Sequence, residues 1–137
     1  MEELATLYRL GQLYAHNCHN TVARVVFFQD HSFLGELYPT YEGHYDDVVE
    51  RMIGLGTLPN LNEIQLTAAQ HLSMYPSEVK ENGECFSSLL SLEKMICKHI
   101  ESLIFEGGPS QGTINLLADM ADKSEQRQYK IGQRIKK

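Results

Sequence analysis

Residues 19–56 read HNTVARVVFFQDHSFLGELYPTYEGHYDDVVERMIGLG, and this stretch decides the fold that the rest of the chain must accommodate. From Leu34 to Ile53 its apolar side chains recur at steps of three and four, which is typical of a helix with one buried face. The sequence Gly54-Leu55-Gly56 then provides a good helix end. The stretch therefore predicts a long amphipathic helix and indicates an all-α protein.

Two features interrupt this helical pattern. Val25-Val26-Phe27-Phe28 places β-branched and aromatic side chains where the rhythm fails, which predicts a turn that brings His19 and His31 together on adjacent antiparallel segments. Pro39 lies within the stripe, where a proline loses a hydrogen bond and clashes with the preceding turn. Gly35, four residues earlier, can ease a kink, so the pattern is compatible with one kinked helix or with two helices.

Four polar residues in or beside this stretch, His19, His31, Asp46 and Glu50, form a candidate metal site. Imidazole nitrogens and carboxylate oxygens together suit a divalent transition metal with open positions, iron above all. Asp46 and Glu50 lie four residues apart and share one face of a helix. If one helix holds both His31 and Asp46, they lie roughly 22 Å apart, whereas metal ligands sit only about 2 Å from the ion. The spacing therefore predicts a site shared by two copies related by a two-fold axis.

The remaining apolar residues predict three more long helices and one short helix. Stripes with helical spacing run from near Met1 to Val22, over 62–74, over 83–106 and from Ile114 to Ile135. The connection that begins at Leu58-Pro59-Asn60 must traverse the length of a bundle, because a tight turn cannot join two parallel neighbouring helices. We therefore expect a four-helix bundle with a short helix between the second and third long helices.

The composition fits a single globular domain over residues 1–137. The chain is 42% hydrophobic and 22% charged, and it contains no apolar run near the ~20 residues that cross a bilayer. The acidic start lacks the pattern of a signal peptide, so we expect a cytoplasmic protein without a membrane segment. Cys18, Cys85 and Cys97 are odd in number and show no C-x-x-C spacing, so they are expected to be reduced and mostly buried.

The net charge of −6 argues against nucleic-acid binding over the whole surface and is compatible with an acidic interior that attracts cations. Residues 126–137 are the exception, because they carry five basic side chains and no acid. Cations late in a helix also suit its dipole, so the cluster is either a helix ending or a weak DNA contact. Its basic residues are Arg127, Lys130, Arg134, Lys136 and Lys137.

The spacing His19-x11-His31, followed by Asp46-x3-Glu50-Arg51 and Leu55-Gly56, resembles the ferroxidase signature of the Dps family, the DNA-protection mini-ferritins. The resemblance is strong over residues 17–56 and weaker over 84–135. It implies a ferritin-like four-helix bundle, with one kinked helix at Pro39 and a short helix in the long crossover. It further implies a homo-oligomeric cage of twelve subunits that binds iron(II) between two-fold-related chains, oxidises it preferentially with hydrogen peroxide and stores ferric mineral, with zinc or manganese as competing ions.

Three positions depart from the Dps pattern. Asn20 stands where the family has a tryptophan after the first histidine, and Gly35, beside Glu36, stands where it has a further aspartate ligand. Tyr129 replaces a tryptophan late in the last helix. These departures motivate an alternative hypothesis, a structural or nucleoid-associated shell whose weakened metal site has little ferroxidase activity.

Other polar residues leave alternatives open. His16, one turn before His19, is either an extra ligand or supporting group, or an ordinary helix histidine. Asp119, Asp122 and Glu125 line an iron-entry pore at a three-fold axis, as the resemblance implies, or form a plain solvated face. Phosphate-binding loops, nucleophile turns and H-E-x-x-H zinc pairs are absent from the sequence. The absence of E-x-x-H motifs argues against a di-iron centre inside a single bundle.

Overall fold

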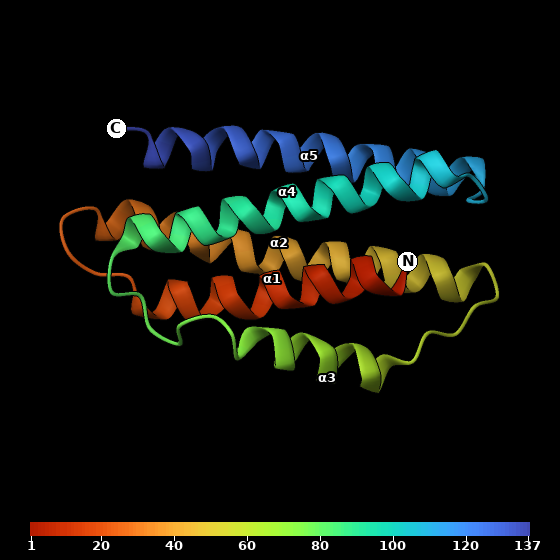
Figure 1. Ribbon diagram of the computed structural model, residues 1–137, viewed down its shortest axis with the longest axis horizontal. Helices are drawn as coiled ribbons and strands as arrows, with labels where there is room; N and C mark the ends of the chain where they lie inside the picture. Colours follow the sequence, from red (N-terminus) through yellow and green to blue (C-terminus); the bar gives the residue numbers. More distant parts are fainter. The chain divides into compact units, whose positions relative to one another are not determined.

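The computed structural model describes residues 1–137 and is entirely helical, which confirms the predicted all-α fold class (Figure 1). None of its helices combines the length and the apolar character that crossing a membrane requires. The five helices are α1 (Glu2–Thr21), α2 (Phe27–Gly54), α3 (Leu61–Leu72), α4 (Asn82–Glu106) and α5 (Gln111–Ile135).

The chain divides into two compact units, residues 1–85 and residues 86–137. The first unit contains α1, α2, α3 and the beginning of α4. The second contains the rest of α4 and all of α5. The four residues of the candidate metal site all belong to the first unit.

In the first unit, α1 and α2 form an antiparallel pair whose buried faces meet (Figure 1). Near the middle of the pair, a Cβ atom at Gly11 would lie 3.1 Å from the ring of Tyr41, so the glycine permits the close approach of the two helices. The buried side chains repeat at helical spacing on each helix, as the amphipathic stripes predicted. They include Leu4, Tyr8, Tyr14 and Cys18 on α1 and Leu34, Leu37, Tyr41 and Val48 on α2.

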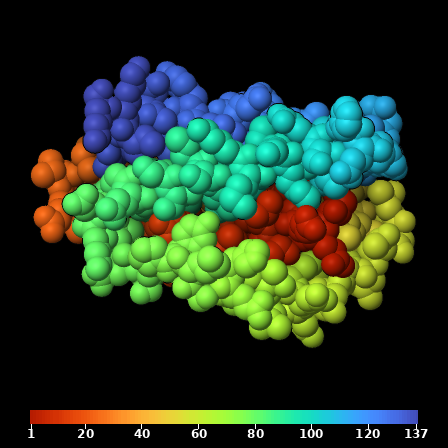
Figure 2. All heavy atoms as spheres, viewed as in Figure 1, coloured from red at the N-terminus to blue at the C-terminus, as the bar shows by residue number.

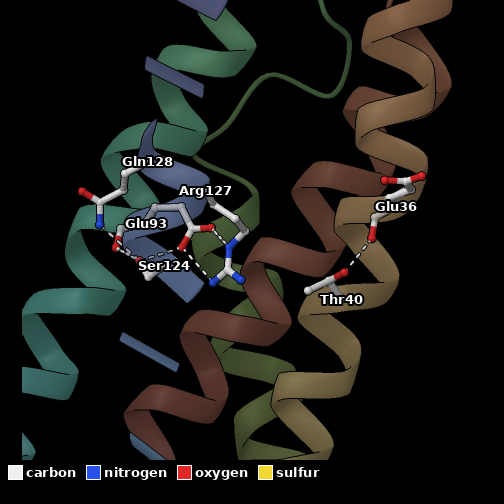
Figure 3. A network of polar contacts seen from close by, with 6 residues as sticks. All are labelled: Glu36, Thr40, Glu93, Ser124, Arg127 and Gln128. Atoms are coloured by element: carbon white, nitrogen blue, oxygen red, sulfur yellow. Dashed lines mark hydrogen bonds and ion pairs between the residues drawn. The ribbon is translucent and has the colours of Figure 1, made fainter. Parts of the chain in front are cut away.

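Helix α2 continues through Pro39, so the alternative of two separate helices is wrong. Pro39 lies on the exposed face, where the missing hydrogen bond has no buried neighbours to disturb. Beside it, the Thr40 hydroxyl donates to the Glu36 carbonyl at 2.8 Å, a contact drawn in Figure 3 that is common where helices bend.

The turn between α1 and α2 lies earlier than the sequence predicted. It spans residues 22–26, whereas Phe27 and Phe28 already belong to α2. Arg24 adopts a left-handed backbone conformation with φ of 77°, and its carbonyl accepts the Phe27 N–H at 3.1 Å. This local reversal, rather than the run of bulky side chains, turns the chain.

Helix α3 lies between α2 and α4 in the chain and packs along α1. It begins at the Asn60 cap, whose side chain accepts the Glu63 N–H at 3.1 Å. Ile64 and Ala68 form its buried face. Hydrogen bonds to Tyr45 and Glu2 attach the segment to the first two helices.

In the second unit, α4 and α5 run antiparallel, because Phe86 meets Arg134 at one end of the pair while Glu93 meets Arg127 further along. Gly107 and Gly108 end α4 with positive φ angles of 75° and 100°, a conformation that favours glycine. The core of the unit consists of Phe86, Leu89, Leu92, Ile96, Ile100, Leu117, Met120 and Ile131. The prediction for the cysteines is confirmed, since all three are free and buried.

Candidate functional site

The structure brings His19 and His31 into direct contact at the turn between α1 and α2, as the sequence predicted. The His19 Nδ1 lies 2.9 Å from the backbone carbonyl of His31, and the two rings stack with centroids 3.9 Å apart. Because a carbonyl only accepts hydrogen bonds, Nδ1 of a neutral His19 carries the proton. Its Nε2 then keeps a free lone pair, which is the arrangement found in histidines that bind metals.

The two imidazoles lie close enough together to reach the same ion. A ligating nitrogen lies about 2 Å from the metal, so two imidazoles on opposite sides of one ion have ring centroids at most about 6 Å apart. The 3.9 Å between the His19 and His31 centroids lies within this limit, but the two ring planes are only 26° apart, so one ring must turn for both nitrogens to reach one ion. The His16 ring lies 6.3 Å from the His19 ring, at the limit of this range, and stacks on Tyr38 at 4.0 Å instead.

The His19 ring packs against α2 at Gly35, where the missing side chain leaves room for it. A Cβ atom at this position would lie 3.0 Å from Cε1 and 3.2 Å from Nδ1 of His19. From the sequence, Gly35 could be interpreted only as a missing carboxylate and as a residue that eases the kink at Pro39. Its contact with His19 depends on how α1 and α2 are aligned, which no local pattern encodes.

Asp46 and Glu50 lie far from the two histidines of the same chain. Both carboxylates are exposed, one turn apart on the same face of α2. Because α2 is one continuous helix, the 15 residues between His31 and Asp46 separate them by roughly 22 Å. A single chain therefore does not bring the four predicted ligands to one ion.

Of the acidic residues on this part of α2, Glu42 already has partners in the chain. The guanidinium of Arg9 lies 4.0 Å from the Glu42 carboxylate, and Gln12 also donates a hydrogen bond to it. The same guanidinium stacks over the Tyr45 ring at 3.8 Å. Neither Asp46 nor Glu50 forms a hydrogen bond or ion pair within the chain, so both carboxylates are available to an external cation.

A second polar cluster, which the sequence analysis missed, is buried between α4 and α5 (Figure 3). Glu93 is fully buried and forms an ion pair with Arg127, while the Ser124 hydroxyl donates to Glu93 at 3.0 Å. Glu93 is the only buried glutamate, and its carboxylate is paired with the Arg127 guanidinium. The fold also reduces the number of basic side chains that residues 126–137 expose, because Arg127 is buried in the second unit and Arg134 lies over the Phe86 ring.

Two of the three acidic residues singled out on α5 have partners of the ordinary kind on the helix surface. Asp119 forms an exposed ion pair with Lys123 at 2.8 Å, and Asp122 accepts a hydrogen bond from Gln126 at 2.9 Å. Glu125 instead lies near Cys97 and Glu101, with one ligand atom of each within 4.8 Å of the others. Burial, with Glu101 and Glu125 adding to it, raises the pKa of the Cys97 thiol and keeps it protonated.

Comparison with known proteins places these observations in a family. A comparison with curated proteins found no significant match. The family description "Ferritin-like domain" matches residues 2–137, which include all five helices and the four candidate ligands. The protein therefore belongs to the ferritin-like family.

Proposed function

We propose that this protein is a ferroxidase and iron-storage protein of the Dps type, with an iron site shared between two copies of the chain. Membership of the ferritin-like family supports iron storage or iron oxidation at the level of the family. The finer assignment rests on one observation. His19 and His31 lie in contact at one end of α2, while Asp46 and Glu50 are exposed carboxylates without partners in the chain toward its other end.

An antiparallel pair of α2 helices completes such a site. If two copies of α2 cross about a two-fold axis near residues 40 and 41, His31 lies at the level of Glu50 of the partner subunit, and Gly35 lies at the level of Asp46 of the partner subunit. The same symmetry creates an equivalent site at the other end. Each site then takes imidazoles from one chain and carboxylates from the other.

Exposed apolar side chains at both ends of α2 support the same arrangement independently. Phe28 is 82% exposed and Ile53 is 46% exposed, and an axis near residue 40 places each opposite the other on the partner. Val25 and Leu55, which are 97% and 61% exposed, form a second such pair. Figure 2 shows both ends of α2 at the surface, the segment around residues 25–28 in orange and the segment around residues 53–55 in yellow. Exposed apolar residues that become complementary under one symmetry operation are expected of a dimer interface.

The chemistry follows from the donor set. His19 and His31 supply nitrogen ligands for the substrate iron(II), and Asp46 and Glu50 of the partner subunit supply anionic oxygens that stabilise iron(III) after oxidation. Each iron(II) releases one electron, so two iron ions reduce one hydrogen peroxide molecule, which takes up two protons and leaves as two water molecules. Removing iron(II) and peroxide together prevents hydroxyl-radical formation and so protects DNA, with zinc or manganese as competing ions.

The proposal extends to the assembly. Twelve cytoplasmic chains form a hollow homo-oligomer that stores the ferric product. Each subunit is a four-helix bundle in which α3 lies in the crossover between α2 and α4. DNA binding is weak, because the exposed basic residues at the end of α5 reduce to Lys130, Lys136 and Lys137 beside a net charge of −6.

Adding iron(II) and then peroxide to the protein without oxygen tests the activity. We expect absorbance of ferric-oxo species near about 310 nm to rise quickly with the natural sequence and slowly with His19→Ala. A second candidate function, a shell with little ferroxidase activity, is favoured by the absence of a carboxylate at Gly35. An assembled protein that oxidises iron(II) no faster than buffer would support the shell and refute the ferroxidase.

A further inference from the structure

The ring of His19 lies so close to the backbone of α2 at Gly35 that a Cβ atom there would require it to shift by a few tenths of an ångström. The hypothetical Cβ at Gly35 meets the ring at 3.0 Å, a separation at the limit of real Cβ contacts. The obstructing group is a rigid imidazole rather than the far end of a flexible chain. The His31 ring also stacks on it, at 3.9 Å between centroids.

The same turn of α2 also fixes the proton of the imidazole. The His31 carbonyl, which in a helix accepts the N–H of Gly35, additionally accepts the Nδ1–H of His19 at 2.9 Å. The contact of the His19 ring with Gly35 keeps Nδ1 within hydrogen-bond distance of the His31 carbonyl. Nε2 is then the nitrogen left to bind an ion.

We infer that Gly35 is a positioning residue, whose missing side chain fixes the His19 ring in the tautomer with the proton on Nδ1. Dps proteins carry a carboxylate at this position. In this chain Gly35 instead leaves the space that the His19 ring occupies. The effect on iron oxidation rests on the proposed function. The effect on the ring itself does not, and the two are measured separately.

The test compares Gly35→Ala with Gly132→Ala. Gly132 is a helical glycine in α5, and a Cβ there would meet nothing within 4 Å, so the control makes the same chemical change without a steric conflict. Nitrogen chemical shifts of the imidazoles, recorded on metal-free protein at about pH 8, where free imidazole is neutral, report the tautomer directly. We expect the Nδ1–H form of His19 in the natural protein and in Gly132→Ala, and its loss in Gly35→Ala.

Metal binding provides the second measurement. Titration with cobalt(II) should show an affinity about 10- to 100-fold weaker for Gly35→Ala, the usual effect of losing a group that orients a ligand. Gly132→Ala should bind cobalt(II) like the natural protein. Unchanged His19 tautomer and unchanged cobalt(II) affinity in Gly35→Ala would overturn the inference. A changed tautomer in a protein that never oxidises iron would refute the proposed function and leave the inference standing.

Gly35 has a competing explanation, because Pro39 clashes with the carbonyl of the residue four positions earlier. In a Pro39→Ala background that explanation expects Gly35→Ala to be harmless, whereas our inference expects the same tautomer change. If Gly35→Ala lowers the folded fraction, a double-mutant cycle replaces the spectra. Gly35→Ala should then destabilise the protein only while His19 is present, and equal destabilisation in a His19→Ala background would contradict us.

Discussion

Mixing two inactive variants, His31→Ala and Glu50→Ala, tests which chain supplies which ligand. Each variant alone should assemble and yet oxidise iron(II) severely more slowly, because every site lacks one ligand. In the structure His31 and Asp46 lie roughly 22 Å apart on the continuous helix α2, so a site that uses both residue types needs two chains. In a mixed dimer one site carries both defects and the other carries neither.

The expected recovery follows from this symmetry. A mixed dimer regains about half of the activity of the natural dimer, because one of its two sites is complete. Random association of equal amounts makes about half of the dimers mixed, so the whole sample recovers roughly a quarter of the natural activity. A site contained within one chain predicts no recovery at any ratio.

The assay requires subunits that exchange. The two variants are unfolded together, refolded and separated by size, and mass spectrometry confirms the mixed dimers before iron(II) and peroxide are added. As a control, each variant is refolded alone. Confirmed mixed dimers without recovered activity would refute the shared site, even if the protein forms a cage.

Three further predictions concern assembly, stability and DNA. Phe28→Asp should shift the protein toward smaller species in sedimentation experiments, because it places a charge in the proposed apolar contact. The same change at the exposed Met95 of α4 should not, and equal behaviour of the two variants would exclude the contact. Arg127→Ala should lower the free energy of unfolding, measured in urea titrations, by about 3–5 kcal/mol, because it leaves the buried Glu93 carboxylate unpaired. A loss below about 1 kcal/mol would contradict this account. DNA binding should be weak in gel-shift titrations and should fall steeply when the salt concentration is raised. It should decrease further in a variant that ends before Arg134. Tight binding by this shortened chain would show that the contact lies elsewhere.

The sequence alone determined the helices of this protein, because the period of the apolar residues is a local property that records which side of a helix is buried. It predicted the ends of α1, α4 and α5 to within about three residues and the approach of His19 to His31, but it began the second helix at Leu34, seven residues after Phe27. It placed the first turn too late, since bulky side chains at Val25–Phe28 suggested a break that the left-handed conformation of Arg24 produces earlier.

Only the tertiary structure decided which side chains meet across two helices. Arg127 reads in sequence as part of a basic cluster, and Gly35 reads as a missing ligand. The alignment of α4 with α5 buries Arg127 against Glu93, and that of α1 with α2 sets His19 onto Gly35. Such contacts depend on the offset between segments distant in the chain, and a shift by one turn of about 5.4 Å would replace every one of them while leaving each helical pattern unchanged.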